Sequence, residues 1–198
     1  MTREERRAAA REGILAAAHR QVAEGGCGAA SVAAVAARAG VASGSIYHHF
    51  PSRAELLAEV IGDALRAEHA LLARAVKGRP PRAALAAWVA TVVERALQAP
   101  GLTQALLEEP ADPAVIAVRL RERRAQEGTL SAVLEEGART GAWPSGDAAA
   151  QASAIMGALR AAVVGPAAAA RLGPQPDPRA EADKLVAFVC GAIGLPPD

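Results

Sequence analysis

The sequence predicts an all-α fold for its 198 residues, and three observations support this. Hydrophobic residues make up 52% of the chain, with alanine supplying much of that share, whereas aromatic residues make up only 3%. Alanine and leucine favour helix, and the apolar residues recur at helical spacing rather than alternating as in a strand. Clusters of Gly and Pro divide the pattern into about nine helices.

Three of these helices are expected before residue 51, and each has a local start or stop signal. Thr2 and Glu5 form a capping box for the first helix, which should end near residue 25. Ser31 is placed to cap the second helix. Gly40 should end it, because glycine takes the left-handed conformation without a Cβ clash. A third helix over about 42–48 then completes a helix-turn-helix.

The later helices are marked in the same way. Ser52 and Glu55 form a second capping box, and the following apolar residues repeat over more than five turns to about Val76. Asp147 is expected to cap one later helix, which should end by Gly165-Pro166. The predicted later helices cover about 53–76, 81–99, 102–109, 113–141, 147–165 and 178–193, with a Pro/Gly-rich loop at 167–178.

Charge and cysteine content indicate which classes of protein the sequence fits. The net charge is +1, but residues 1–53 carry seven Arg against four Glu, an excess of three positive charges. A basic N-terminal third fits a nucleic-acid surface, although solvated helix faces would look the same. The cysteines, Cys27 and Cys190, are far apart in sequence, which suits a reduced cytoplasmic protein. We expect neither a signal peptide nor a membrane span.

The helix-turn-helix segment carries a longer motif. It reads Gly44-Ser45-Ile46-Tyr47-His48-His49-Phe50-Pro51-Ser52-Arg53, followed by Glu55-Leu56-Leu57, after a helix that ends in Ala39-Gly40-Val41. This string resembles the DNA-binding domain of the tetracycline-repressor (TetR) family over roughly residues 11–60. The resemblance implies a helix-turn-helix domain at 1–51 and an effector-binding and dimerisation domain at 52–198.

The resemblance also implies which residues meet DNA. The N-terminal turn of the third helix would face the bases in the major groove, and Tyr47 and His49 match residues that contact the DNA backbone. Arg53 matches a basic residue that pairs with phosphate, and Ser31 is a backbone contact as well as a cap. The full predicted DNA-binding set is Ser31, Ser43, Gly44, Ser45, Tyr47, His48, His49 and Arg53.

The sequence departs from the family pattern at three positions in or beside this set. Ala42 stands where many members have a capping Ser, Ala33 where many have a long polar side chain, and Ser43 where a longer residue is common. Serine hydroxyls discriminate weakly between bases. Direct readout should therefore be sparse, so that either DNA shape contributes more or affinity is modest. The two serines could also act only as caps.

The second domain would hold a small-molecule effector and form the homodimer. Each candidate pocket residue could equally be plain core, and Arg160 could face either an anionic effector or an ion pair in the dimer. The apolar faces of the last two helices need a partner, which in the family is a second subunit. The candidates are Trp88, Val92, Leu102, Leu106, Leu107, Ile116, Leu120 and Met156 for the pocket, and Ala152, Ile155, Leu159, Val163, Leu185, Val186, Val189 and Ile193 for the dimer interface.

These features predict a homodimeric DNA-binding transcriptional regulator, most simply a repressor that a small molecule releases from a palindromic operator. Two other classes of protein compete with it: an enzyme with a helix-turn-helix-like head, and a helical adaptor that binds a protein through its last two helices. We expect no catalytic residues, no cofactor and no metal. A metal site at His48, His49 and Cys27 is disfavoured, because adjacent helical residues point about 100° apart.

Overall fold

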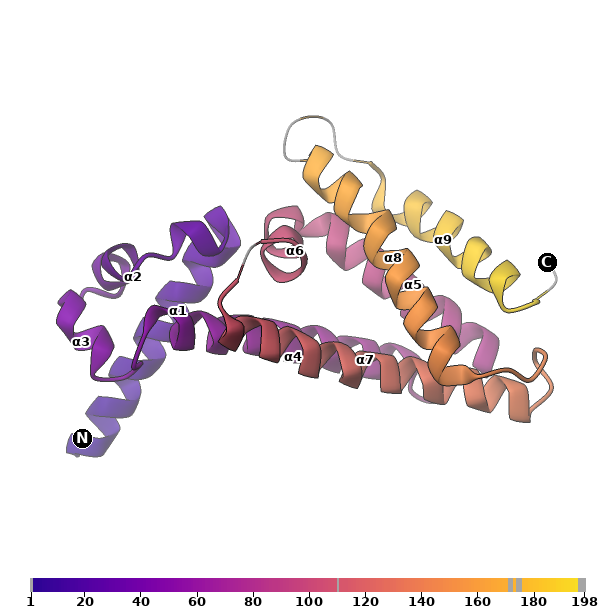
Figure 1. Cartoon of the computed structure of the whole chain (residues 1–198), viewed down its shortest axis with the longest axis horizontal. Coiled ribbons are helices and arrows are strands. Elements are labelled where there is room, and N and C mark those ends of the chain that lie inside the picture. Colours follow the sequence, from indigo (N-terminus) through magenta and orange to yellow (C-terminus); the bar gives the residue numbers. More distant parts are fainter. Residues whose placement is uncertain (1, 110, 171–172, 174–175, 196–198) are drawn as a thin grey trace.

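The structure of the chain, a computed structural model, describes residues 2–109, 111–170, 173 and 176–195 (Figure 1). Within these ranges every regular element is a helix, which confirms the predicted all-α fold. The helices are α1 (Arg3–Ala29), α2 (Val32–Ala39), α3 (Ser43–Tyr47), α4 (Arg53–Val76), α5 (Pro81–Gln98), α6 (Pro100–Leu107), α7 (Pro113–Arg139), α8 (Ala148–Ala170) and α9 (Pro178–Ala192).

The predicted caps hold the helix starts. The Thr2 hydroxyl accepts from the Glu5 N–H at 3.1 Å, and the Glu5 carboxylate accepts from the Thr2 N–H at 2.7 Å. Ser31 and Ser52 each accept a backbone N–H at the first turn of α2 and α4. These bonds satisfy donors that have no partner inside the helix, so a local signal is enough to fix each start.

Two helix ends differ from the expectation. The first helix continues beyond residue 25 as a further turn to Ala29, although Gly26 is non-helical with φ 76° and ψ −177°. Helix α8 continues through Pro166 to Ala170 instead of ending at Gly165-Pro166. The four alanines after Pro166 are strong helix formers, and they carry the helix past a proline that removes one backbone bond.

The helices form a small head and a larger body, which α4 connects (Figure 1). Helices α1 to α3 gather at one end of the molecule. Helix α4 starts in the head and then runs along α7, and α5 packs between α4, α7, α8 and α9. Any movement of α4 relative to the body must therefore move the head.

Each part has its own hydrophobic core. The body core surrounds the fully buried Trp88, and the core of the head surrounds Ile14, Ile46 and Phe50. The core of the head also takes in Leu106 and Val115 from α6 and α7. Helices α6 and α7 of the body thus pack directly against the head, and this contact sets the orientation of the head relative to the body.

Helix α8 is long and apolar enough, by length and composition alone, to cross a membrane over Ala148–Pro166. Its larger side chains face inward, however, and Ile155 and Leu159 are buried in the body core. The side of α8 that faces outward carries mainly alanine and glycine. The helix therefore has the character of a core helix with one open, small-residue face.

Candidate nucleic-acid interface and ligand pocket

Helices α2 and α3 are joined by the short turn that the sequence predicted. Gly40 ends α2 with φ 69°, and the Val41 N–H donates to the Ala36 carbonyl at 3.0 Å. Ala42 is the N-cap of α3, and no side chain there accepts from the first N–H groups of the helix. Exposed N–H groups at a helix start can donate to phosphate oxygens.

Helix α3 presents one side to solvent and buries the other. Ile46 is 1% exposed and Phe50 2%, whereas Tyr47 is 55% exposed. Ser43, Gly44 and His48 are exposed as well, and Ser45 and His49 are half-buried. The structure thus brings the six predicted α3-region residues onto or beside one open surface, and the exposed Ser31 at the start of α2 lies in the same helix-turn-helix.

The surroundings of His49 favour a neutral imidazole. Its Nδ1 is buried without a hydrogen-bond partner. Burial lowers the pKa of His49 below its ordinary value, and the positive charges of Arg7, His48 and Arg11 act in the same direction. A neutral ring with its proton on Nε2 leaves Nδ1 as an unprotonated acceptor and offers the Nε2–H to a phosphate oxygen.

Arg53 already has partners inside the protein. Its Nε donates to the Ala30 carbonyl at 3.0 Å, and its Nη2 donates to the Cys27 carbonyl. These carbonyls lie at the end of α1, where the Cys27 carbonyl also accepts from the Ala30 N–H at 3.2 Å. Arg53 therefore ties the start of α4 to the end of α1, and a phosphate contact by Arg53 stays a prediction.

Arg53→Ala is expected to destabilise the head, because two carbonyl groups lose a charged donor. We expect the free energy of unfolding to fall by about 1–3 kcal/mol, measured by thermal or urea denaturation. The dependence of DNA affinity on salt separates the two roles, since loss of a phosphate contact lowers its slope by about one unit. A variant with wild-type stability would show that the carbonyl contacts carry no weight.

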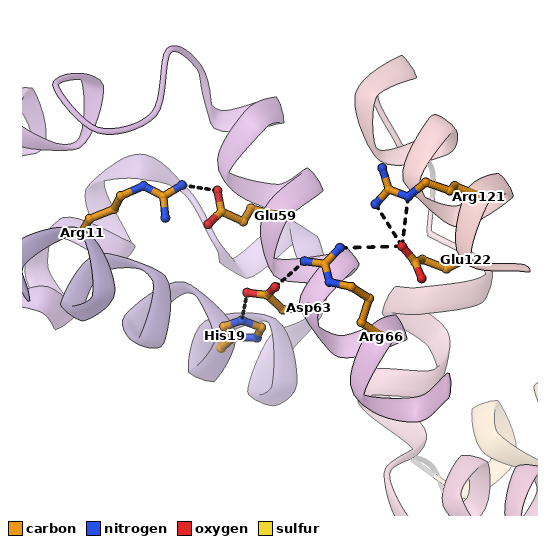
Figure 2. Close-up of polar contacts among 7 residues, drawn as sticks. All are labelled: Arg11, His19, Glu59, Asp63, Arg66, Arg121 and Glu122. Atoms are coloured by element: carbon orange, nitrogen blue, oxygen red, sulfur yellow. Dashed lines mark hydrogen bonds and ion pairs between the residues drawn. The ribbon is translucent and has the colours of Figure 1, made fainter. Parts of the chain in front are cut away.

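A line of ionisable side chains joins the head to the body across α4 (Figure 2). His19 on α1 lies 3.4 Å from Asp63 on α4, and Asp63 pairs with Arg66 at 2.5 Å. Arg66 in turn lies 3.6 Å from Glu122 on α7. Glu122 is only 5% exposed, and it is paired with both Arg66 and Arg121, the latter at 2.9 Å. Arg11 likewise pairs with Glu59 across α1 and α4.

The body contains a cavity of about 310 Å³ beside α4, at the lower end of the size range of small-molecule sites. Seven of the eight predicted pocket residues line it; Trp88 does not, because it is fully buried in the body core. Arg160 lines it too, with its guanidinium on the Leu107 carbonyl and on Glu108 at 3.0 Å. The lining residues are Leu65, Glu68, Leu72, Val92, Arg95, Ala96, Ala99, Leu102, Thr103, Leu106, Leu107, Ile116, Arg119, Leu120, Arg123, Gln126, Met156, Leu159, Arg160 and Val163.

Most of the residues predicted for the dimer interface pack inside the protomer. Ala152, Ile155, Leu159, Val163, Val189 and Ile193 are all buried in the body core, and only Leu185 and Val186 are partly accessible. The apolar faces of α8 and α9 do need a partner, but within the described residues that partner includes α5 of the same chain. A second subunit would have to meet the opposite face.

A second contact between head and body passes through Cys27. The Cys27 N–H donates to the Glu109 carboxylate at 2.6 Å, just after the non-helical Gly26. Burial, and secondarily the charge of Glu109, raises the pKa of the Cys27 thiol to about 11. The thiol therefore stays protonated at neutral pH, which makes it a poor nucleophile and a structural residue. Sequence reasoning missed Glu109, because its partner lies far away along the chain.

The comparisons with known proteins agree with this architecture. Residues 14–60 match the sequence profile of the bacterial regulatory proteins of the tetR family. The fold is similar to that of FadR from Bacillus subtilis, solved in complex with stearoyl-CoA, with a TM-score of 0.76 and 20% identity over 90% of this chain and 96% of that one. It is also similar to a tetR-family regulatory protein from Rhodococcus RHA1, with a TM-score of 0.74 and 22% identity over 95% and 98% of the two chains.

Escherichia coli NemR in its reduced form is a third similar structure, with a TM-score of 0.73 and 20% identity over 95% of this chain and 100% of that chain. No match was found among curated protein sequences. At these identities the likeness to the solved structures establishes the fold, over nearly the full length of each chain. The match at 14–60 covers the helix-turn-helix together with the end of α1 that packs on it and the first part of α4.

Proposed function

We propose that this chain, which carries the DNA-binding domain of the tetR family over residues 14–60 and the fold of that family's solved members, is a DNA-binding transcriptional regulator without enzymatic activity. The finer proposal is a homodimeric repressor that leaves a palindromic operator when a small molecule binds in the body. Action on chromosomal DNA would place it in the cytoplasm.

The open surface of α3 is the observation that carries the proposal. Ser43 and Gly44 lie at the exposed start of that helix, and Tyr47 extends from its end. Small residues at the start let the helix backbone approach base edges in a major groove. A phenol hydroxyl at the other end has a suitable reach for a phosphate oxygen. This arrangement therefore favours a DNA-binding protein over an adaptor or an enzyme.

Tyr47→Phe tests this interface, since it removes only one hydroxyl. Tyr47 is 55% exposed, so the variant should unfold at the wild-type temperature while its DNA affinity falls by about tenfold. Gel-shift titrations with the DNA upstream of its own gene, beside thermal melts, measure both quantities. Equal DNA affinity of variant and wild type would remove Tyr47 from the interface, and wild-type protein that binds no such DNA would contradict the regulator itself.

The outward face of α8 and α9 is the surface that we propose for the homodimer. Phe188 on α9 is 57% exposed, an unusual position for a large aromatic side chain. On α8 the exposed residues Ala154, Gly157 and Ala161 follow one another at helical spacing. Such small residues let a second helix approach closely, and a dimer would supply the two heads that a palindrome requires.

Helix α4 supports the proposed release of DNA by an effector. Its first turns pack in the core of the head through Leu56 and Val60, and further along Leu65, Glu68 and Leu72 line the cavity. A ligand that fits the cavity in only one position of α4 would bias the position of the head. A differential affinity of this kind is what shifts a two-state equilibrium.

A further inference from the structure

The cavity in the body is lined by more positive than negative charge. Four arginines line it, at positions 95, 119, 123 and 160, and Glu68 is the one carboxylate among its described lining residues. Most of the remaining lining is aliphatic. An apolar cavity that gathers cations has an electrostatic preference for an anion, provided that some of these cations are not already neutralised.

Three of the four arginines have carboxylate partners of their own. Arg95 pairs with Glu68 at 2.5 Å, and Arg123 pairs with Glu127 at 2.9 Å. Arg160 lies 3.0 Å from Glu108. These pairs are each close to neutral, so they add polarity at the edge of the cavity but little unbalanced charge.

Arg119 is different. Its Nη1 donates to the Glu109 carbonyl at 2.9 Å and its Nη2 to the Ala105 carbonyl at 2.5 Å, both of which are neutral acceptors. Its Nε is buried and has no hydrogen-bond partner. The nearby carboxylates are committed elsewhere, Glu109 to the Cys27 N–H and Glu108 to Arg160. A half-buried guanidinium whose buried Nε has no partner is stabilised by an anion that reaches it.

We infer that the effector is a small amphipathic carboxylate, whose anionic group binds the Arg119 guanidinium while its apolar part lies among the aliphatic side chains of the cavity. Ile116 and Leu120, 46% and 52% exposed, extend from α7 next to Arg119 and would cover such an apolar part. Burial lowers the pKa of Arg119, and a bound carboxylate would reverse that direction. The volume of about 310 Å³ favours a short ligand.

The same arginine is connected to the head. The Glu109 backbone that Arg119 holds carries the carboxylate that accepts from the Cys27 N–H. The Cys27 carbonyl in turn accepts from Arg53 at the start of α4. A carboxylate that draws Arg119 toward the cavity would therefore weaken the hydrogen bond between Arg119 and the Glu109 carbonyl. Glu109 in turn contacts the head through Cys27. This connection rests on the proposed function, whereas ligand binding itself does not.

Calorimetric titration with octanoate tests the ligand class directly. It uses the whole chain in whichever oligomeric state it is purified. Matched titrations with 1-octanol and octylamine keep the apolar chain and change only the charge of the head group. Octanoate should bind at least about tenfold more tightly than either of the other two. Equal or tighter binding of the alcohol or the amine, or no binding of octanoate, would overturn the inference.

Two variants on α7 test the anchor. Arg119→Gln should weaken octanoate binding by about 10- to 100-fold, whereas Arg124→Gln, an exposed position outside the cavity lining, should bind as the wild type does. Circular dichroism checks that both variants are folded. If Arg119→Gln is unfolded, Arg119→Lys replaces it and should weaken binding because it keeps the charge but loses the planar fork. Unchanged affinity in the folded Arg119 variant would overturn the assignment.

Gel shifts with and without octanoate separate this inference from the proposed function. Wild-type protein that binds octanoate but no DNA would contradict the regulator and leave the ligand class standing. Protein that binds DNA but not octanoate would contradict the ligand class and leave the regulator standing. We expect octanoate to release DNA from the wild type. Arg119→Gln lacks the hold on Glu109, so it should bind DNA more weakly before octanoate is added, and octanoate should not weaken its DNA binding further.

Discussion

Leu159→Glu is expected to unfold the protomer, and not only to separate a dimer. Leu159 is 1% exposed and packs in the body core. Loss of the leucine alone removes about 2–5 kcal/mol of stability, and the desolvation of a carboxylate in its place lowers the stability further. Since whole domains are stable by only about 5–15 kcal/mol, circular dichroism and urea denaturation should show little or no folded protein.

Phe188→Glu is the contrasting change on the neighbouring helix. Because Phe188 is 57% exposed in the protomer, a charge there should leave the fold intact. If the outward face of α8 and α9 forms the dimer, light scattering should find folded monomers with much weaker binding to a full palindrome. Phe188→Tyr is the matched control and should remain dimeric. A dimeric Phe188→Glu, or a folded Leu159→Glu, would contradict this division between buried and outward faces.

Gly26→Ala is expected to lower the free energy of unfolding by about 2–4 kcal/mol, through two effects. The backbone at Gly26, with φ 76° and ψ −177°, lies in a region that is almost reserved for glycine, and another residue there is strained by about 1–3 kcal/mol. A Cβ would also lie 2.0 Å from the Glu109 Oε1, which displaces the carboxylate from the Cys27 N–H.

Gly28→Ala is the matched control, two residues further along. A Cβ at Gly28 meets no atom within 4 Å, and its φ is not positive, so this variant should unfold within about 1 kcal/mol of wild type. Thermal and urea denaturation of the two variants compare the positions directly. Equal stability of both variants would show that Gly26 tolerates a side chain and that the Glu109 contact can be replaced.

The helix-turn-helix could be predicted from the sequence because its signals are local. The cap at Ser31 and the turn at Gly40 act on N–H and C=O groups within a few residues, and the structure contains both as predicted. The alternation of buried Ile46 with exposed Tyr47 also follows from a single turn of helix. The motif at 44–57 is local as well, and it predicts a DNA-binding surface without reference to any long-range contact.

Arg53 shows where local reasoning stops. From the sequence it is a basic residue at the start of a helix beside a DNA-binding surface, which fits a phosphate contact. In the structure its guanidinium also meets the carbonyls of Ala30 and Cys27, more than twenty residues earlier. These acceptors are available only because α1 ends beside the start of α4, and that placement depends on packing in three dimensions.

The sequence by itself determined the helices, their order and the helix-turn-helix, because periodicity and capping depend on neighbours along the chain. Of the twenty residues that line the cavity, it singled out seven. Only the tertiary structure decided which face of α8 and α9 is inside. Periodicity shows that Leu159 and Val189 lie on a buried face, yet it is silent on whether α5 or a second subunit covers that face. The hydrophobic effect is non-directional, so any partner that excludes water stabilises such a face. Whether α5 or a second subunit covers it therefore depends on how the helices pack together.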